Sequence, residues 1–516
     1  MKLAGAAFLL AAILIPTGMV IPAAAGDRLD QLRVGAWLLR IGLAALGAFA
    51  LLLARTKLEG RIEGLRPTRP LALLLVATLA LRLWRLDEGL WLDEIYTIVR
   101  YMRLPLSEIA AIYGSENQHF LFSLMARLST VAFGESAWAV RLPAVLFGVA
   151  SIWALYLFAR ETAGERDALL ASALLAFSYH HVWFSQNARG YTGLLFWTLL
   201  SSWLLLVALR QNSSRVWIFY AIAAALGAYT QATMIFVLAG HFAVAVFHPG
   251  RRWKPLAAGF GLAALLVFTL HAIAIPQILS GVASTRSVVA EWKRPLWMLG
   301  EVARGLQVHF FGGIVASAAL AVFAVGAASL WRTRRVVLAL LALPPIAGAV
   351  VILALGHHIW PRFFFFIFGF AALVVIRGAV RIGEMLLGRF AILAPLSLVA
   401  VSALSVPFAF GPKQDYAAAL AFVNANRSPG DAVVTADLAA WTYRNYYRVD
   451  WPSVESAAQL ERIRAAAPRT WMVHTLEPVL EAQFPGLLAA LRRDFRIAAV
   501  FPGTLKNGAV VVSVSR

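Results

Sequence analysis

The sequence predicts a polytopic α-helical membrane protein that ends in a small soluble α/β domain. Two properties of the composition predict the membrane part: 61% of the 516 residues are hydrophobic, and only 14% are charged. Soluble proteins carry about 25% charged residues, so this composition argues against a soluble chain. The third observation is a change of pattern after Pro412, where long apolar runs give way to short helix-like and strand-like segments.

Apolar runs of about 17–25 residues, the length that crosses a bilayer, predict about 13 membrane spans. They lie near residues 3–25, 34–55, 69–85, 139–159, 167–184, 191–209, 216–231, 232–248, 256–278, 307–331, 337–356, 360–377 and 389–410. Basic residues cluster in the short loops between these runs, and such loops normally face the cytoplasm. The net charge of +20 is therefore a topology signal and does not indicate a nucleic-acid partner.

This charge pattern predicts a multi-pass protein of the plasma (inner) membrane with its N-terminus in the cytoplasm. Segments 86–138 and 279–306, and everything after about residue 410, then lie outside. Residues 1–26 begin with Met1-Lys2 and end in three alanines and a glycine. That pattern resembles a cleaved signal peptide, although the run is also long enough to remain as a first span.

We divide the chain into an N-terminal two-span extension (1–68), a transmembrane module (69–410) and a soluble extracytoplasmic domain (411–516). In the last part, helix patterns cover 415–426, 454–467 and 476–495, and strand patterns cover 431–436, 470–474, 497–501 and 509–514. Alternation of this kind favours an α/β domain with a partly parallel sheet. No glycine-rich phosphate loop occurs in it, so a nucleotide site is not predicted.

The loop after the third predicted span carries four carboxylates, at Asp87, Glu88, Asp93 and Glu94, in a chain with only 26 acidic residues. Carboxylates beside a membrane span are costly to desolvate and often serve chemistry. Asp87 and Glu88 fit an ordinary water-exposed loop. Asp93 and Glu94, set among aromatic residues, are the better candidates for a functional site.

Metal binding is not indicated. The chain contains no cysteine. The adjacent pairs His180-His181 and His357-His358 do not readily face one ion and have no matched carboxylate spacing. A divalent metal is compatible with the sequence, but no cofactor is predicted.

Five motifs occur in order along residues 70–410: Gly89–Glu94, Trp138–Pro143, Ser185–Tyr191, Ala228–Gln231 and Trp360–Phe363. In sequence and order they resemble the motifs of the GT-C superfamily of polyprenyl-phosphate-sugar glycosyltransferases. The likeness is greatest to the family 39 group, which includes protein O-mannosyltransferases and the lipid A aminoarabinose transferase. The chain departs from the family pattern at three positions. His119 lacks the prolines that usually follow it, Asn187 stands where an acid is common, and Gln231 stands where histidine is common.

The resemblance implies transfer of a sugar from a lipid-linked phosphate to an acceptor hydroxyl at the outer face of the membrane. Asp93 matches the family's acidic position and fits the general base, and Glu94 would orient it or bind acceptor. Arg189 and Arg362 are the candidates for the donor phosphate, because phosphate needs cationic partners.

His119 and Tyr96 complete the predicted substrate-binding set. The expected partners are a polyprenyl-phosphate-linked sugar, a glycan, lipid or protein acceptor, and membrane lipids, with no nucleic acid. Two other functions remain open: a transporter or flippase of lipid-linked saccharides, and a scaffold for envelope assembly. A flippase more often places ionisable residues inside its spans, whereas the acids of this chain gather in an external loop.

Overall fold

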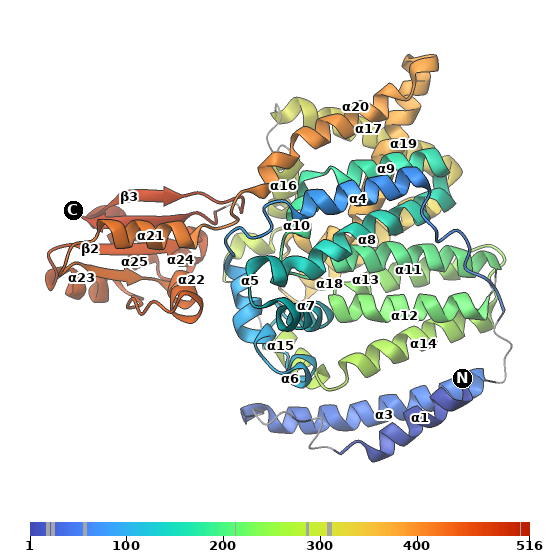
Figure 1. Cartoon of the computed structure of the whole chain (residues 1–516), viewed down its shortest axis with the longest axis horizontal. Coiled ribbons are helices and arrows are strands. Elements are labelled where there is room, and N and C mark those ends of the chain that lie inside the picture. The colour runs from blue at the N-terminus through green and yellow to red at the C-terminus, as the bar shows by residue number, and fades with distance from the viewer. Residues whose placement is uncertain are drawn as a thin grey trace.

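The protein is a long bundle of helices with a small sheet domain attached at one end (Figure 1). The computed structural model describes residues 1–16, 21, 26–54, 59–211, 213–284, 288–306, 312–505 and 507–516. Most of the predicted cleavage motif before Gly26, the end of the first predicted span and the start of the span predicted at 307–331 lie outside the described residues.

The N-terminal extension is a pair of helices packed along one side of the bundle (Figure 1). It consists of α1 (Lys2–Leu14), the short helix η1 (Gly26–Arg28) and α3 (Leu29–Leu53). Helix α3 lies close to the region around residues 269–273. A Cβ on Gly35 would stand 2.3 Å from the carbonyl oxygen of Ile273, and one on Gly42 would stand 2.6 Å from Oγ1 of Thr269. Small residues of this kind allow helix backbones to approach closely inside a membrane.

Twelve further helices form the body of the transmembrane module within the described residues. They are α4 (Arg69–Leu83), α8 (Ala137–Ala163), α9 (Glu165–Ala176), α10 (Tyr179–Ser185), α11 (Tyr191–Gln211), α12 (Ser214–Thr230), α13 (Met234–Val246), α14 (Trp253–His271), α17 (Gly312–Thr333), α18 (Arg335–Ala354), α19 (Phe368–Leu386) and α20 (Leu393–Leu404). Helices α8 and α11 are at the centre, and most of their side chains are buried. The large apolar core forms around them because both helices are hydrophobic on all sides.

Seven helical stretches of the described residues are long and apolar enough to cross a membrane: 26–53, 137–163, 191–211, 253–271, 335–354, 361–386 and 388–410. This confirms a polytopic helical protein, while the number of about 13 spans stays a prediction. Two predicted spans are interrupted. The segment predicted at 167–184 is divided between α9 and α10, and the one at 256–278 ends at His271. The next helix begins at Ile275 with Pro276 in its first turn, where proline's missing N–H is tolerated.

Short helices gather at the end of the bundle that faces the sheet domain (Figure 1). They are α5 (Leu92–Thr97), η2 (Ile98–Met102), α6 (Leu106–Ala111), α7 (Phe120–Phe133), α15 (Ile275–Ser284), η3 (Ala290–Lys293), α16 (Pro295–Leu306) and η4 (Pro361–Ile367). Helices α6 and α7 both belong to segment 86–138, which follows the third predicted span. After α19 the chain forms η5 (Gly388–Phe390) and then α20. The next element, η6 (Val406–Phe410), leads into the sheet domain at this end.

The sheet domain has four strands in the order β1-β2-β4-β3. Strands β1 (Ala432–Thr435) and β2 (Thr470–Thr475) are parallel, whereas β4 (Val510–Ser515) runs antiparallel to both β2 and β3 (Phe495–Phe501). All six residues of β2 are buried, as expected for a central strand. The accompanying helices are α21 (Tyr416–Asn426), α22 (Asp437–Thr442), η7 (Tyr443–Tyr447), α23 (Ala457–Ala465), α24 (Glu477–Gln483) and α25 (Pro485–Asp494).

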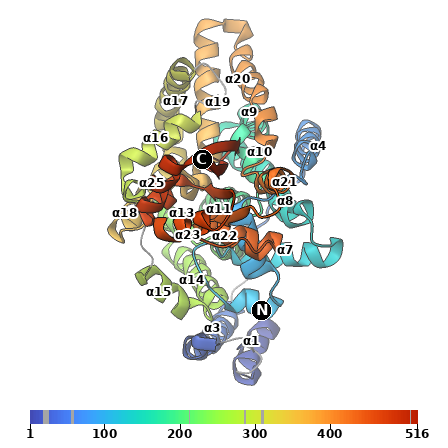
Figure 2. The same ribbon diagram turned by 90° about the vertical axis from the view of Figure 1, so that its left-hand side faces the viewer.

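The sheet domain packs directly on the end of the bundle, in front of the helices in Figure 2. The Leu92 N–H donates to Oε1 of Gln414 over 3.0 Å, and Lys413 Nζ donates to the carbonyl oxygen of Gln186 over 2.7 Å. Trp183 Nε1 donates to Oγ1 of Thr504 over 2.7 Å. The junction therefore anchors the first residue of α5 and the turn after α10, which are the segments that carry the predicted site.

Candidate active site

Four segments that are far apart in the sequence meet beneath the sheet domain. They are α5, the loop before α7, the turn between α10 and α11, and the start of η4, and they bring Asp93, Glu94, His119, Arg189 and Arg362 together.

Glu94 is fully buried and holds the other segments in place. Its carboxylate accepts two hydrogen bonds from Arg141 of α8, from Nε over 2.8 Å and from Nη2 over 2.6 Å. It also accepts from the N–H groups of Ala188 (2.7 Å) and Trp91 (3.3 Å). Burial alone would raise the pKa of Glu94, but the charges of Arg141 and Lys413 and these hydrogen bonds hold it below its ordinary value. Glu94 is thus an ionised, fully bonded anchor between α5, α8 and the turn that carries Arg189.

Asp93 has a different environment from its neighbour. Its Oδ2 lies 3.3 Å from Nη1 of Arg362. This contact is an ion pair without hydrogen-bond alignment, and no described residue makes a hydrogen bond to that buried oxygen. The main-chain oxygen of Asp93 accepts from Oγ1 of Thr97, so the backbone is fixed while one carboxylate oxygen keeps its capacity to accept a proton or a hydrogen bond.

Arg189 is buried and is held by the loop before α7. Its Nη1 donates to Oγ1 of Thr97 (3.1 Å) and to the main-chain oxygen of Asn117 (3.0 Å), and its Nη2 donates to Oδ1 of Asn117 (2.8 Å). No carboxylate in the described chain forms an ion pair with it, and its Nε has no hydrogen-bond partner there. A buried guanidinium without an anion is costly. Arg189 is therefore poised to receive one.

His119 faces Arg189, and both side chains direct a nitrogen at the other. The Gly190 N–H donates to Nδ1 of His119 over 2.8 Å, so a neutral ring must carry its proton on Nε2. Burial and the charges of Arg189 and Arg362 hold the pKa of His119 well below its ordinary value, which keeps the ring neutral. Yet Nε2 lies 3.2 Å from Nη2 of Arg189. Two donors pointing at one another are reconciled by an acceptor, such as a phosphate oxygen.

Unsatisfied polar atoms concentrate at this place. Among the buried side-chain atoms of the described residues without hydrogen-bond partners are Asp93 Oδ2, Asn187 Nδ2, Arg189 Nε and Arg362 Nε. Buried polar groups in folded proteins are nearly always paired, so these atoms have capacity left to bond a ligand. This cluster contains both donors and an acceptor, as a site for a phosphate and a hydroxyl requires.

Tyr96, predicted to bind substrate, lies on α5 one turn after Asp93 and packs against the sheet domain. Its ring centroid is 5.2 Å from that of Trp441 in α22 and 6.1 Å from that of Tyr101. The guanidinium of Arg100 lies 5.8 Å from both the Tyr96 and the Trp441 rings. The structure thus places Tyr96 at the junction with the sheet domain.

Sequence reasoning missed Arg141, Asn117 and Lys413. Arg141 would have been the easiest of the three to predict, because a cation near the start of a long apolar run needs a partner. Asn117 and Lys413 carry no local signal, since their contacts depend on loops that meet only in the folded chain.

The histidine pairs show no metal site. Across the part of the chain that the structure describes, no group of three histidine, aspartate or glutamate side chains is arranged to hold a metal ion. His181 is bonded to Arg82 and Ser151 inside the bundle. His358 lies 3.9 Å from a Glu116 oxygen.

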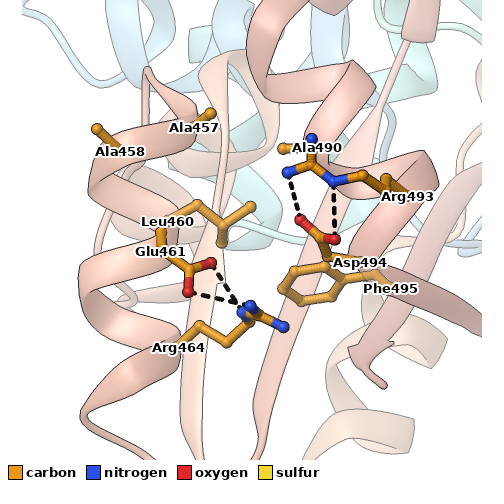
Figure 3. A pocket seen from close by; sticks show the side chains of 9 residues that line it. All are labelled: Ala457, Ala458, Leu460, Glu461, Arg464, Ala490, Arg493, Asp494 and Phe495. Atoms are coloured by element: carbon orange, nitrogen blue, oxygen red, sulfur yellow. Dashed lines mark hydrogen bonds and ion pairs between the residues drawn. The ribbon is translucent and has the colours of Figure 1, made fainter.

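A separate hollow of about 370 Å³ lies between α23 and α25 of the sheet domain (Figure 3). Its charged side chains pair with one another, Arg464 with Glu461 and Arg493 with Asp494. None of the predicted site residues lines it, and its ion pairs leave no charge there for a ligand.

The fold is similar to that of the Archaeoglobus fulgidus oligosaccharyltransferase solved in complex with Zn and sulfate, with a TM-score of 0.51 and 14% sequence identity over 85% of this chain and 72% of that one. ArnT from Cupriavidus metallidurans, bound to undecaprenyl phosphate, gives a TM-score of 0.46 at 15% identity, over 86% of this chain and 97% of that one.

At the level of sequence, a family model described as dolichyl-phosphate-mannose-protein mannosyltransferase matches residues 117–276. A relative described as the putative mannosyltransferase YkcB of Bacillus subtilis (strain 168) is 29% identical over 171 residues. That match covers 32% of this chain and only 21% of the relative's length. The resemblance to the GT-C superfamily, of the family 39 type, is thereby confirmed. The matched region contains His119, Asn187, Arg189 and Gln231.

Proposed function

We propose that this protein is an integral membrane glycosyltransferase that moves a sugar from a polyprenyl-phosphate donor to an acceptor hydroxyl on the outer face of the membrane. The observation that carries this proposal is the set of unsatisfied buried atoms around Asp93, Arg189 and Arg362. It provides donors for a phosphate and an acceptor for a hydroxyl proton within one cluster. The family model that matches residues 117–276 supports the same reaction class.

In this proposal Arg189, Arg362 and the Nε2–H of His119 hold the donor phosphate. A phosphate oxygen that accepts from both His119 Nε2 and Arg189 Nη2 removes the conflict between the two donors. As the bond between the anomeric carbon and the phosphate oxygen breaks, the leaving group gains negative charge, and these donors stabilise it. His119 acts as a neutral hydrogen-bond donor throughout.

Asp93 is the general base. The acceptor hydroxyl donates to its free oxygen, and the carboxylate takes the proton as the new bond to the anomeric carbon forms. A single displacement of this kind inverts the anomeric centre, as in inverting glycosidases. The products are the glycosylated acceptor and the polyprenyl phosphate.

Glu94 has a positioning role in this scheme. Its buried carboxylate is occupied by Arg141 and by two main-chain N–H groups, so it contacts neither sugar nor acceptor. It fixes α5, and hence Asp93, relative to the turn that carries Arg189. Tyr96 similarly supports the site through the junction with the sheet domain.

The alternative function, a flippase of lipid-linked saccharides, would use ionisable groups within the bundle. The buried Arg82 of α4 is one such group, but its guanidinium is bonded to Ser185, His181 and the main-chain oxygens of Thr78 and Ala176. A guanidinium whose donors are occupied in this way stabilises the packing of the helices and is not available to a transported ligand. The structure gives the flippase no comparable support.

The proposal is tested by incubating the purified full-length protein with synthetic polyprenyl phosphates that carry single sugars, together with lipid, glycan and peptide acceptors. Release of free polyprenyl phosphate with formation of a glycosylated product supports it. Mass spectrometry of lipid-linked sugars in a deletion strain identifies the donor that accumulates. Movement of the lipid-linked sugar across vesicles without bond cleavage would favour the flippase instead.

A further inference from the structure

A second cavity lies next to the candidate active site, and the N-terminal extension forms part of its wall. Its volume is about 380 Å³, near the lower end of the roughly 300–1,000 Å³ range of small-molecule sites. Its polar lining includes Arg28, Gln31, Ser115, Glu116, Gln277 and His357. These residues come from η1, α3, the loop before α7, α15 and the segment before η4.

The loop before α7 connects this cavity to the catalytic cluster. Asn117 in this loop binds Arg189, while its neighbour Glu116 lines the cavity. A Glu116 oxygen lies 3.9 Å from Nε2 of His358. Burial raises the pKa of Glu116, against the charges of His357, Arg362 and Arg189, and Asp93 raises it further. The cavity and the candidate site are therefore within electrostatic reach of each other.

Two charged side chains of the cavity, Arg28 and Glu116, form few contacts that stabilise the fold. Within the described ranges, no hydrogen bond or ion pair joins the Arg28 side chain to another residue, and the 3.9 Å contact with His358 is the only ion pair of Glu116. Gln31 makes one long hydrogen bond, from Nε2 to Oγ of Ser280 over 3.3 Å, which leaves its carbonyl oxygen available.

Other parts of the lining are fixed and give the cavity a defined shape. Gln277 is buried, accepts from the N–H of Tyr113 (3.1 Å) and donates to the main-chain oxygen of Ala111 (2.8 Å). The ring of Tyr113 also lines the cavity and packs on Phe120. An aromatic wall combined with amide, carboxylate and guanidinium groups that can still form hydrogen bonds suits a compact ligand with many hydroxyl groups. Such a lining does not suit an apolar prenyl chain.

We propose that this cavity binds the sugar ring of the donor, and that Arg28 and Gln31 of the N-terminal extension, together with Glu116, determine which sugar is accepted. This inference rests on the proposed glycosyltransferase function and specifies the part of the substrate that the extension recognises. The sugar is held by Glu116 and Gln31 as acceptors and by Arg28 as a donor to its hydroxyl groups. The donor phosphate, which is bonded to the anomeric carbon of this sugar, extends past Glu116 and Asn117 to Arg189 and His119.

Each of these hydrogen bonds discriminates between sugars. A site that bonds a hydroxyl rejects a sugar that lacks or inverts it, because its own polar groups are then left unpaired. Loss of one such bond weakens binding by up to roughly tenfold. Removing Arg28 or Gln31 therefore relaxes the choice of sugar more than it slows the chemical step.

The test compares Arg28→Ala, Gln31→Ala and the wild type with polyprenyl phosphates carrying mannose, glucose, galactose or N-acetylglucosamine. We expect the donor KM for the preferred sugar to rise roughly tenfold in either variant, and the ratio of kcat/KM between sugars to move towards one. The kcat at saturating donor should change less than threefold. Arg33→Ala is the matched control, since Arg33 is an exposed cation of α3, close to Arg28 and Gln31 in the sequence, that does not line the cavity.

A binding experiment separates failure of this inference from failure of the proposed function. Saturation-transfer NMR with the soluble 1-phosphates of the same sugars reports contact with the ring protons without any transfer. If the wild type transfers sugar but both variants keep its KM and sugar preference, the cavity is not the sugar subsite, while the proposed function stands. If no sugar is transferred but ring contact is lost only in the Arg28 and Gln31 variants, the result supports the sugar subsite and contradicts the proposed transfer reaction. Equal ring contact in all proteins overturns the subsite.

Discussion

Asp93 and Glu94 are adjacent in sequence but have opposite environments. The Glu94 carboxylate accepts four hydrogen bonds and is completely buried, whereas Oδ2 of Asp93 has only the ion pair with Arg362. Because α5 turns by about 100° per residue, two neighbouring acids point to different sides. Glu94 thereby stabilises the site, and the Asp93 carboxylate is left to act in it.

Glu94→Gln and Arg141→Met should each destabilise the protein strongly. Each variant leaves one buried partner unpaired, and breaking a buried ion pair costs about 3–5 kcal/mol. Unfolding in detergent, followed by tryptophan fluorescence, measures the change. Arg103→Met is the matched control, because Arg103 makes the same two-pronged contact with Glu135 at a more exposed position and should cost at most about 1 kcal/mol. Equal effects at both pairs would contradict the anchoring role.

Arg189→Lys should weaken donor binding although it keeps the positive charge. Lysine cannot reproduce the bonds from Arg189 to Thr97 and Asn117 and also meet a phosphate. We expect the donor KM to rise roughly tenfold or more with a smaller change in kcat. Arg127→Lys on α7 provides the control for an arginine-to-lysine change at a residue with no proposed role. A donor KM unchanged by Arg189→Lys would remove Arg189 from the phosphate site.

The two amide replacements of His119 should behave differently. In the structure Nδ1 accepts from Gly190, and Nε2 is left to donate. Glutamine carries its amide nitrogen near the position of Nε2, whereas asparagine reaches only to the position of Nδ1. His119→Gln should therefore retain more donor affinity than His119→Asn, by up to roughly tenfold. Equal losses in direct donor-binding measurements would show that Nε2 does not contact the donor.

Lys413 should make the junction with the sheet domain sensitive to pH. Burial, with the charge of Arg141, lowers the pKa of Lys413 to about 7, from an ordinary value of 10.5. Between these two values the unfolded chain binds a proton that the folded chain does not, so stability rises with pH across this window. The melting temperature of the wild type should rise relative to Lys413→Met between pH 7 and pH 10. Lys254→Met, which removes an exposed lysine, gives the background, and a constant difference between wild type and Lys413→Met would contradict the prediction.

The helices and strands could be predicted from the sequence because their signals are local. Each predicted span overlaps a described helix, and each strand of the sheet lies in or beside a segment with a strand pattern. The interruption after His271 was missed, because an apolar run does not show where a helix ends, although Pro276 was a visible warning.

The site was predictable only in part. Asp93 stood out because carboxylates are scarce beside the spans, and Arg189 and Arg362 followed from motifs. The pairing of Glu94 with Arg141, 47 positions away, depends on the packing of α5 against α8 and has no local signature. The cavity lined by Arg28 and Gln31 was missed for the same reason, since the N-terminal extension looked like a separate unit in the sequence.

The central claim is that Asp93 removes the proton of the acceptor, and the most direct measurement is the single-turnover rate of sugar transfer by Asp93→Asn. Asn keeps the shape of the side chain but cannot take a proton, so the rate should fall by at least about 100-fold, with donor affinity within roughly twofold of the wild type. Asp87→Asn, which changes an exposed acid of the same loop, should transfer at the wild-type rate. Transfer by Asp93→Asn at the wild-type rate would contradict the account.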